Sequence, residues 1–349
     1  MGKLSFASDY MEGAHEAILS RLQTNNYIKM AGYGTDPLTE SAREKIRTAC
    51  GCPNADVFFL TGGTQTNAAV IGALLRPYEG VLSAISGHIY THEAGAVESG
   101  GHKVLLLPEY LGKISAGDIQ DTIEQYEVDE NRDHLVRPGM VYISQPTEFG
   151  ALYSLSELRD ISRVCRKKRI PLYVDGARLA YALACPENNV TLQDLAELCD
   201  VFYIGGTKCG ALFGEAVVVP QRGFIPHFVT VMKQHGALLA KGWLLGLQFD
   251  TLFTNGLYQE IGRPAIAAAN RIRNALRETG FQLAYDNPTN QVFPVLENKK
   301  MAKLAEAVDF CFWEKYDYEQ SIIRLAASWA TTDADTDRLI AVLKQLQQG

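Results

Sequence analysis

Four groups of residues that can do chemistry follow apolar runs of the chain, and the first is the glycine-rich segment 61–67 (TGGTQTN). Gly62 and Gly63 let the backbone approach an anion closely, Thr64 adds a hydroxyl donor, and the free N–H groups that open a helix favour a phosphate. The spacing fits neither the dinucleotide fingerprint nor the Walker loop. The segment therefore indicates a phosphate site, with a plain glycine-rich turn as the alternative.

The second group is the segment 174–178 (VDGAR), in which Asp175 stands at the end of a strongly apolar run. A carboxylate there is costly unless it meets a positive partner, and a protonated pyridine nitrogen would be one. That pairing keeps a cofactor ring electron-poor. Arg178 suits a substrate carboxylate or a ring hydroxyl. The alternatives are an aspartate that caps the next turn and an arginine in a surface ion pair.

The third group is the segment 204–210 (IGGTKCG), where Lys208 stands among small residues just after an apolar run. Most lysines stay solvated and charged. A lysine in a tight, partly apolar site has a lowered pKa and can form a Schiff base with an aldehyde. The small neighbours also leave room for a flat ring.

The fourth group contains His88, which follows the apolar run 81–86. An imidazole there can stack on a flat cofactor and relay a proton near neutral pH, although lone histidines are more often structural, as we expect for His92. A phosphate site, a stacking histidine, a pyridine-pairing aspartate and a Schiff-base lysine form one coherent set for one cofactor. We expect that cofactor to be pyridoxal 5'-phosphate.

The elements that must position these residues alternate between strands and helices. Strands are predicted over 57–60, 81–86, 102–108, 140–145, 171–176, 201–206 and 215–220, and helices over 64–75, 154–169 and 191–199. Ser154 and Glu157 form a capping box at the start of one helix. The alternation predicts an α/β fold with a doubly wound, mainly parallel sheet, which binds its ligand at the carboxyl ends of the strands.

The length of 349 residues favours two domains. We expect a large cofactor-binding domain over 31–245 and a smaller α/β domain made of 1–30 and 246–349. Gly280 is predicted to stop a helix in the second part.

Bulk properties limit the function classes. The formal net charge of −7 disfavours a nucleic acid or an anionic membrane as partner. We expect no membrane span, because no apolar run is long enough, and no secretory signal in the first residues. The seven cysteines are scattered, and Cys50 and Cys52 lack a second pair at zinc spacing, so we expect no metal site. Free thiols indicate the reducing cytoplasm.

With these residues assembled, nearly the whole chain resembles the threonine aldolase branch of the β-eliminating lyase family. Its members have the aspartate-aminotransferase-like fold, also called fold type I. The DGAR and TK motifs, 175–178 and 207–208, are specific for the branch. Further similarity lies at 8–9, 33–37, 62–64, 88, 93–95 and 324–325.

The resemblance implies a role for each site residue. Lys208 would bond the cofactor covalently, Asp175 would pair with the pyridine nitrogen, and His88 would stack on the ring and handle the substrate hydroxyl. The phosphate would be held by Gly63, Thr64 and Thr207, and the substrate carboxylate by Ser8, Arg178 and Arg324. Family members are homodimers or homotetramers with sites at the interface, so Tyr33, Lys233 and Lys241 would reach a neighbour's site.

The implied activity is cleavage of L-threonine, L-allo-threonine or a related β-hydroxy-α-amino acid into glycine and an aldehyde. Two positions depart from the pattern: Glu148 stands where many relatives have histidine, and Thr207 where many have serine. Glu148, placed to contact the substrate, leaves open which group is the second proton carrier and favours a phenylserine-type sub-branch. The same residues are also compatible with a pyridoxal-phosphate lyase of a different reaction type, an aminotransferase or a catalytically silent homologue.

Overall fold

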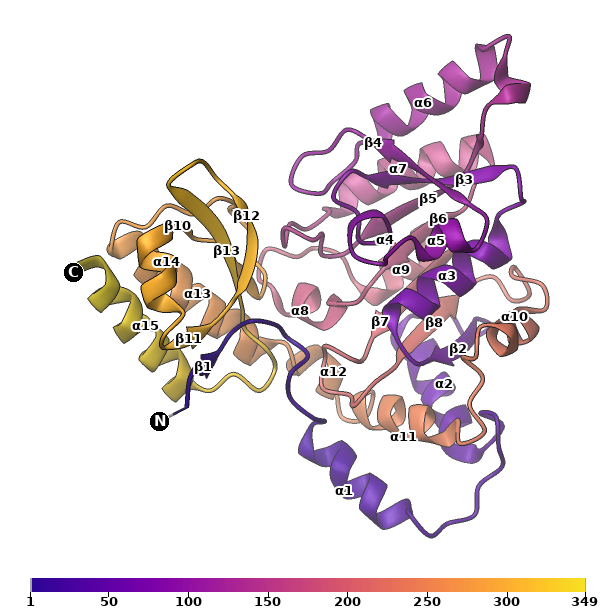
Figure 1. The fold of residues 1–349 in the computed structure, drawn as a ribbon. Helices are drawn as coiled ribbons and strands as arrows, with labels where there is room; N and C mark the ends of the chain where they lie inside the picture. The colour runs from indigo at the N-terminus through magenta and orange to yellow at the C-terminus, as the bar shows by residue number, and fades with distance from the viewer. Residues whose placement is uncertain (1, 349) are drawn as a thin grey trace.

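The computed structural model describes residues 2–348, and its centre is a seven-stranded sheet (Figure 1). The strand order is β2-β8-β7-β6-β5-β3-β4. The strands are β2 (Asp56–Leu60), β3 (Glu79–Ala84), β4 (Lys103–Leu107), β5 (Arg137–Ser144), β6 (Leu172–Asp175), β7 (Val201–Gly205) and β8 (Glu215–Val219). Only β8 runs antiparallel to its neighbours, β2 and β7. The predicted α/β fold with a mainly parallel sheet is confirmed.

Helices cover both faces of this sheet because alternate strand residues are buried on opposite sides. On one side Val141 and Val174 share a core with α7 (Leu155–Lys168), and on the other side Tyr142 and Tyr173 share a core with α3 (Gly63–Leu74). The remaining helices near this sheet are α2 (Pro37–Ala49), α4 (His88–Thr91), α5 (Ala96–Ser99), α6 (Ala116–Val128), α8 (Leu179–Ala184), α9 (Leu192–Leu198), α10 (Phe228–Gln234), α11 (Trp243–Leu252) and α12 (Leu257–Glu260). The predicted capping box at Ser154 and Glu157 starts α7.

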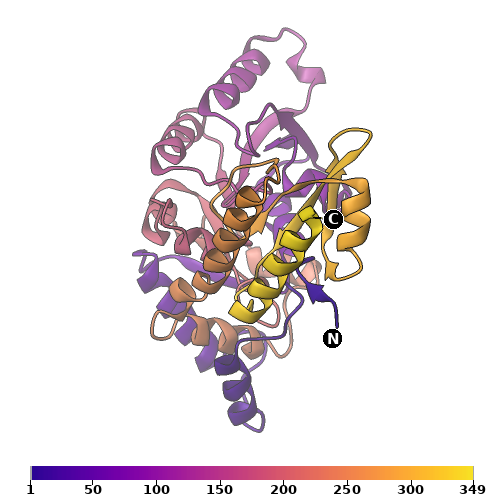
Figure 2. The same ribbon diagram turned by 90° about the vertical axis from the view of Figure 1, so that its left-hand side faces the viewer.

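A smaller antiparallel sheet lies on the left in Figure 1. It contains β9 (Gln291–Val292), β10 (Val295–Glu297), β12 (Cys311–Lys315) and β13 (Gln320–Ala326), and the short strands β1 (Leu4–Ser5) and β11 (Val308–Asp309) pair beside it. The helices α13 (Arg263–Glu278), α14 (Asn298–Leu304) and α15 (Asp333–Gln348) pack on it, with α13 and α15 side by side in Figure 2. The first helix, α1 (Glu16–Asn25), packs against α11 instead.

The predicted helix stop is confirmed, because Gly280 follows α13 with a φ of +82°. The domain limits stay a prediction. No helix among residues 2–348 is long and apolar enough to cross a membrane.

Two glycines bring the ends of β6 and β7 together. A Cβ added to Gly176 would lie 2.0 Å from the Tyr203 carbonyl oxygen, and one added to Gly205 would lie 2.4 Å from the Ala177 carbonyl oxygen. Only glycine permits such a close approach of two backbones. The segments that follow β6 and β7, which carry Arg178 and Lys208, therefore face one cavity.

Candidate active site

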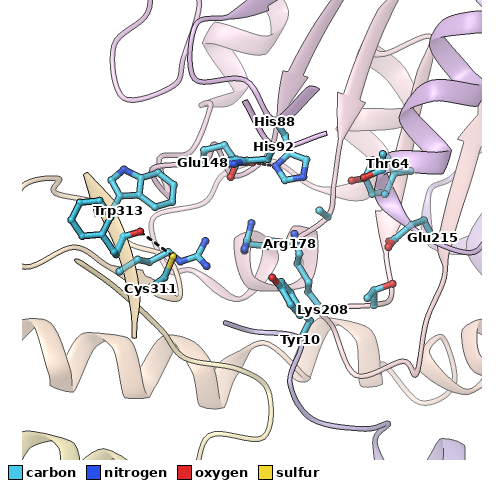
Figure 3. Close-up of a pocket in the computed structure, with 16 residues that line it drawn as sticks. Tyr10, Thr64, His88, His92, Glu148, Arg178, Lys208, Glu215, Cys311 and Trp313 are labelled. Carbon is cyan, nitrogen blue, oxygen red and sulfur yellow. Dashed lines mark hydrogen bonds and ion pairs between the residues drawn. The ribbon is translucent and has the colours of Figure 1, made fainter. Parts of the chain in front are cut away.

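A cavity of about 530 Å³ lies at the carboxyl edge of the large sheet, opposite β12 and β13 (Figure 3). Its wall includes many of the residues singled out in the sequence, namely Gly63, Thr64, His88, Glu148, Arg178, Thr207, Lys208 and Arg324. Segments far apart in the sequence therefore supply one site.

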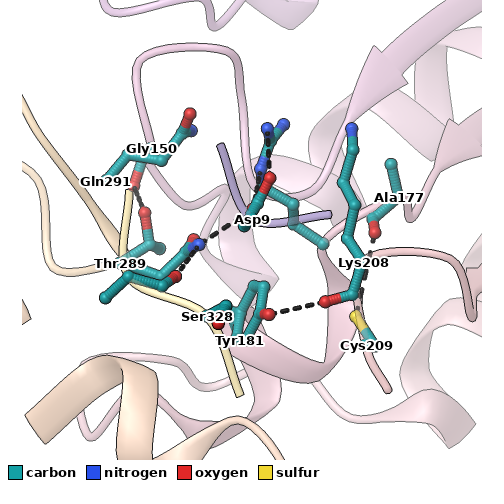
Figure 4. A network of polar contacts seen from close by, with 12 residues as sticks. Asp9, Gly150, Ala177, Tyr181, Lys208, Cys209, Thr289, Gln291 and Ser328 are labelled. Carbon is teal, nitrogen blue, oxygen red and sulfur yellow. Dashed lines mark hydrogen bonds and ion pairs between the residues drawn. The ribbon is translucent and has the colours of Figure 1, made fainter. Parts of the chain in front are cut away.

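Lys208 enters this cavity from the turn after β7. The Tyr181 hydroxyl donates a hydrogen bond of 2.5 Å to the Lys208 carbonyl oxygen and so fixes the lysine backbone (Figure 4). The Lys208 Nζ lies 6.0 Å from the centre of the Tyr10 ring. A primary amine on an anchored backbone, facing a cavity of this size, can bond covalently to an aldehyde cofactor.

Asp175 lies just beneath the cavity, 3% exposed, and does not itself line it. Its carboxylate accepts hydrogen bonds from the Tyr142 hydroxyl at 2.6 Å and the Tyr203 hydroxyl at 2.5 Å. Asn67 Nδ2 at 3.2 Å and the Ala177 N–H at 2.9 Å also donate to it. Because burial raises the pKa of both tyrosines, they remain donors. These donors stabilise a buried anion that can face a cationic ring.

The phosphate site predicted at 61–67 is the start of α3. Gly62 is the N-cap residue of this helix. Because glycine has no side chain that could cap the first turn, the N–H groups of that turn can bind an anion. Thr64, in this first turn, and Thr207, after β7, both line the cavity. A lysine amine, a buried aspartate and this anion site together match the aldehyde, the ring nitrogen and the phosphate of pyridoxal phosphate, so the residues fit that cofactor.

His88 and Glu148 lie within ion-pair distance of each other on the same wall. His88 Nδ1 lies 3.1 Å from Glu148 Oε1. Burial opposes the charged imidazolium, but the Glu148 carboxylate outweighs burial and raises the pKa of His88. Burial would likewise raise the pKa of Glu148, yet the nearby positive charges, that of His88 first, hold it well below its usual range. The site thus has a histidine whose protonation is tuned by a permanent anion.

Arg178 is held by a buried aspartate rather than by an acid at the surface. Its Nε and Nη2 donate to the two Asp9 carboxylate oxygens at 2.7 and 3.0 Å, and Asn290 Nδ2 also donates to Asp9 at 2.9 Å. Against the effect of burial, the Arg178 charge lowers the pKa of Asp9 to about 2. Arg178 therefore faces the cavity as a fixed cation.

Arg324 lies in β13 and extends from the small sheet into the cavity. It donates to the Gln291 side-chain oxygen and to the Ala7 carbonyl oxygen, both at 3.2 Å, and its guanidinium lies 5.5 Å from the Trp313 ring centre. Its contacts among the described residues include no acid within ion-pair distance, and both its Nε and the Ser8 hydroxyl are buried without a hydrogen-bond partner there. Such unsatisfied donors suit a bound carboxylate.

The model of the family described as "Beta-eliminating lyase" matches residues 5–299. The chain belongs to this family.

Two relatives make the similarity more specific. The chain is 28% identical to the low specificity L-threonine aldolase of Pseudomonas sp. (strain NCIMB 10558), over 97% of this chain and 96% of that protein. It is 42% identical to a solved threonine aldolase structure from Leishmania major, with a TM-score of 0.95, over 98% of this chain and 99% of that one. The predicted resemblance, the lyase class and the pyridoxal-phosphate cofactor are confirmed.

The fold is shared more widely than the family. A double mutant of Thermus thermophilus aspartate aminotransferase matches with a TM-score of 0.73 at 15% identity, over 99% of this chain and 91% of that one. At that identity the similarity concerns the fold alone. The predicted aspartate-aminotransferase-like fold is confirmed.

Three residues assigned to a neighbour's site do not line the Lys208 cavity of this β-eliminating lyase. Tyr33 is half exposed and has Lys233 Nζ 4.8 Å from its ring centre. Lys233 lies in α10, and Lys241 is exposed in the segment before α11. Their roles stay a prediction.

Several wall residues were not singled out from the sequence. The residues without an assigned role in the site are Tyr10, His92, Tyr203, Glu215, Cys311, Phe312 and Trp313. His92, expected to be structural, lies at the cavity with its ring centre 5.4 Å from that of His88, and burial lowers its pKa. Glu215 is the first residue of an apolar strand, as Asp175 is the last residue of another. An acid at either limit of an apolar strand is therefore a sequence signal that could have pointed to both residues. The sequence around Trp313 carries no comparable signal, because β12 is half exposed and does not read as a buried apolar strand.

Proposed function

We propose that the chain is an L-threonine aldolase, which cleaves L-threonine, L-allo-threonine or a related β-hydroxy-α-amino acid to glycine and an aldehyde. One observation carries the proposal, namely the His88–Glu148 pair in the cavity that holds Lys208 and Arg324. A retro-aldol cleavage needs a base for a hydroxyl proton, a cation for a carboxylate and an electron sink. The names of the relatives agree with this activity.

The cofactor would be held by residues already described. Lys208 would bond its aldehyde carbon, Asp175 would face its ring nitrogen, and the start of α3 with Thr64 and Thr207 would bind its phosphate. When bound, pyridoxal phosphate withdraws electrons from the α-carbon of an amino acid attached to it.

Arg324 and Ser8 would bind the substrate carboxylate. Their unsatisfied donors, Arg324 Nε and the Ser8 hydroxyl, support this assignment. A carboxylate fixed there would limit rotation of the substrate and so select the Cα–Cβ bond as the one that breaks. Asp175 would keep the ring nitrogen protonated, which favours electron flow toward it.

His88 would take the proton from the β-hydroxyl while the Cα–Cβ bond breaks. Glu148 would stabilise the charged form of the imidazole after the proton is accepted, since its carboxylate lies within ion-pair distance. The proton taken from the β-hydroxyl would then be returned to the α-carbon, so that glycine and the aldehyde together contain all the atoms of the substrate. In this scheme Glu148 acts on the substrate through His88.

We further propose that the chain works as a homodimer or homotetramer with sites at the interface. The positions of Tyr33, Lys233 and Lys241 outside the cavity of their own chain support this, since cationic side chains at an interface can bind a phosphate in the neighbouring subunit. Exposed apolar side chains on nearby segments, such as Tyr27 and Ile28, agree with a covered surface.

We also propose a cytoplasmic location. All seven cysteines are free thiols, which agrees with a reducing compartment.

To test the activity, purified protein is incubated with pyridoxal phosphate and L-threonine, L-allo-threonine or L-phenylserine. Glycine and the corresponding aldehyde are then measured. Equal amounts of both products are expected, and their rates rank the substrates. Lys208→Ala should abolish product formation and also the covalent cofactor adduct trapped by borohydride, whereas Lys303→Ala, on an exposed lysine, should do neither. Release of a keto acid or ammonia without glycine would replace this proposal with a different pyridoxal-phosphate reaction.

A further inference from the structure

A buried carboxyl group, that of Glu215, lies on the phosphate side of the cavity and has no part in the scheme above. Glu215 is the first residue of β8 and is 3% exposed. Because β8 is antiparallel to β2 and β7, its first residue lies at the edge where those strands end, paired with Leu60 and Gly205. In Figure 3, Glu215 and Thr64 lie on the same wall of the cavity.

The hydrogen bonds of Glu215 leave it directed at the cavity. Its Oε2 accepts from the Gly206 N–H at 3.0 Å, in the turn that also carries Thr207 and Lys208. Burial raises the pKa of Glu215 to about 8, outweighing the Thr207 hydroxyl, the Gly206 N–H and the Lys208 charge, which favour the ionised form. At neutral pH the group is therefore mostly a neutral acid, which can donate a hydrogen bond.

The groups that face Glu215 do not supply a competing titration near neutral pH. Tyr203 in β7, Tyr173 in β6 and Tyr258 in α12 have pKa values well above 10, and burial raises the pKa of Cys209 to about 12. The charged neighbours are Lys208, which favours ionisation of Glu215, and Asp175, which opposes it. A phosphate placed beside Thr64 would oppose ionisation further, because two anions repel each other.

We propose that Glu215 contacts the cofactor phosphate as a neutral acid, donating its proton to a phosphate oxygen, and that ionisation of Glu215 weakens cofactor binding. The proposal rests on the pyridoxal-phosphate site of the proposed function. Below pH 8 binding needs no extra proton at this residue. Above pH 8 binding must first restore one proton to Glu215, so affinity falls by about tenfold per pH unit through this group.

The test uses pyridoxine 5'-phosphate, which lacks the aldehyde and so does not react with Lys208. Its dissociation constant is measured by equilibrium dialysis between pH 7.0 and pH 9.5 for the wild type, for Glu215→Gln and for Asp200→Asn. Glutamine keeps a donor but does not ionise, and Asp200 is a partly buried acid away from the cavity, hydrogen-bonded to the Leu172 N–H. Circular dichroism checks that each protein is folded at each pH.

Between pH 7.0 and pH 9.5, the dissociation constant for pyridoxine 5'-phosphate should rise roughly 30-fold more in the wild type and in Asp200→Asn than in Glu215→Gln. Titration of the probe ring affects all three proteins alike, so it cancels in the comparison. Parallel curves for wild type and Glu215→Gln would overturn the proposal. Failure of the wild type to bind the probe at any pH would instead refute the cofactor site and with it the proposed function.

A second measurement needs no variant. Calorimetry at pH 9 in buffers of different ionisation enthalpy reports proton uptake on binding. Pyridoxine 5'-phosphate should take up about one proton more than pyridoxine, which has the same ring and no phosphate. Equal uptake by the two compounds would contradict the role of Glu215, even if Glu215→Gln failed to fold.

Discussion

His88 Nδ1 lies 3.1 Å from Glu148 Oε1, although the two residues are 60 positions apart in the sequence. His88 begins α4, after β3, and Glu148 follows β5. These two strands are parallel neighbours, so both side chains emerge at the same edge of the sheet. Glu148 is buried and ionised, and it acts as a fixed negative charge beside a titrating histidine.

Replacing Glu148 should move the acid limb of the pH profile. The carboxylate favours the imidazolium, so it raises the pKa of His88, and the basic form becomes dominant only at higher pH. In Glu148→Gln that pKa should fall, so kcat/KM should begin to rise at a lower pH than in the wild type, with a lower plateau because the charged histidine loses its partner.

The measurement is kcat/KM for L-threonine between pH 5 and pH 9. Asp160→Asn, which removes an exposed acid paired with Arg163, is the matched control and should keep the wild-type profile. An acid limb that stays in place in Glu148→Gln would show that His88 is not the titrating base.

The part of the site that follows parallel strands was predictable from the sequence. His88, Asp175 and Lys208 each come just after an apolar run, and parallel strands bring such positions to one edge. The structure places His88 and Lys208 in one cavity and Asp175 directly beneath it. Local sequence was sufficient here because each residue is positioned by its own strand.

Further relationships depend on pairing that local sequence does not reveal. The partner of Arg178 is Asp9, 169 positions away, because the segment between β1 and α1, which also carries Tyr10, lies at the cavity. Glu215 reaches the same edge only because β8 is antiparallel, which reverses the end of the strand that faces the ligand. An arginine in an apolar strand such as β13 could be half of a buried ion pair, yet Gln291 and Ala7 receive the hydrogen bonds of Arg324.

Truncating Arg324 should mainly weaken substrate binding. Removal of one partner of a charge-assisted contact typically costs about 2 kcal/mol or more, so Arg324→Ala should lower kcat/KM roughly 30-fold or further through KM. Arg324→Lys keeps the charge but not the fork of donors and should recover only part of the loss. The dissociation constant of pyridoxal phosphate is measured alongside. Unchanged KM for L-threonine in Arg324→Ala would remove the assigned role.

Breaking the Asp9–Arg178 pair should destabilise the fold. Asp9→Asn leaves the Arg178 charge buried without its counterion, a change that typically costs about 3–5 kcal/mol. Urea unfolding monitored by tryptophan fluorescence gives the free energy of unfolding. Asp337→Asn, which breaks an exposed pair with Arg271, should change it by less than about 1 kcal/mol.

The same pair predicts a pH dependence of stability. The pKa of Asp9 is about 2 in the folded chain and near 3.8 in an unfolded one. Its stabilising contribution is therefore complete above pH 4 and is lost as the pH falls toward 2. Wild type and Asp9→Asn should converge in stability over that window, provided both are still folded, and a constant difference down to pH 2 would contradict the assignment.

The proposed neighbour contact of Lys241 can be tested by mixing inactive subunits. Lys208→Ala lacks the covalent anchor, and Lys241→Ala would lack the residue given to the neighbour's site. In a mixed dimer one site then carries both defects and the second carries neither. Random association should restore about a quarter of wild-type activity, since half of the dimers are mixed and each has one complete site.

This outcome separates contact with a neighbour from action within one chain. If Lys241 acts in its own subunit, every site in the mixed dimer keeps one defect, and co-expression restores nothing. Lys299→Ala, on an exposed lysine of α14, should be active alone and serves as the matched variant. Each single variant must first be shown by size-exclusion chromatography to form the same oligomer as the wild type, so that recovered activity reports a shared site.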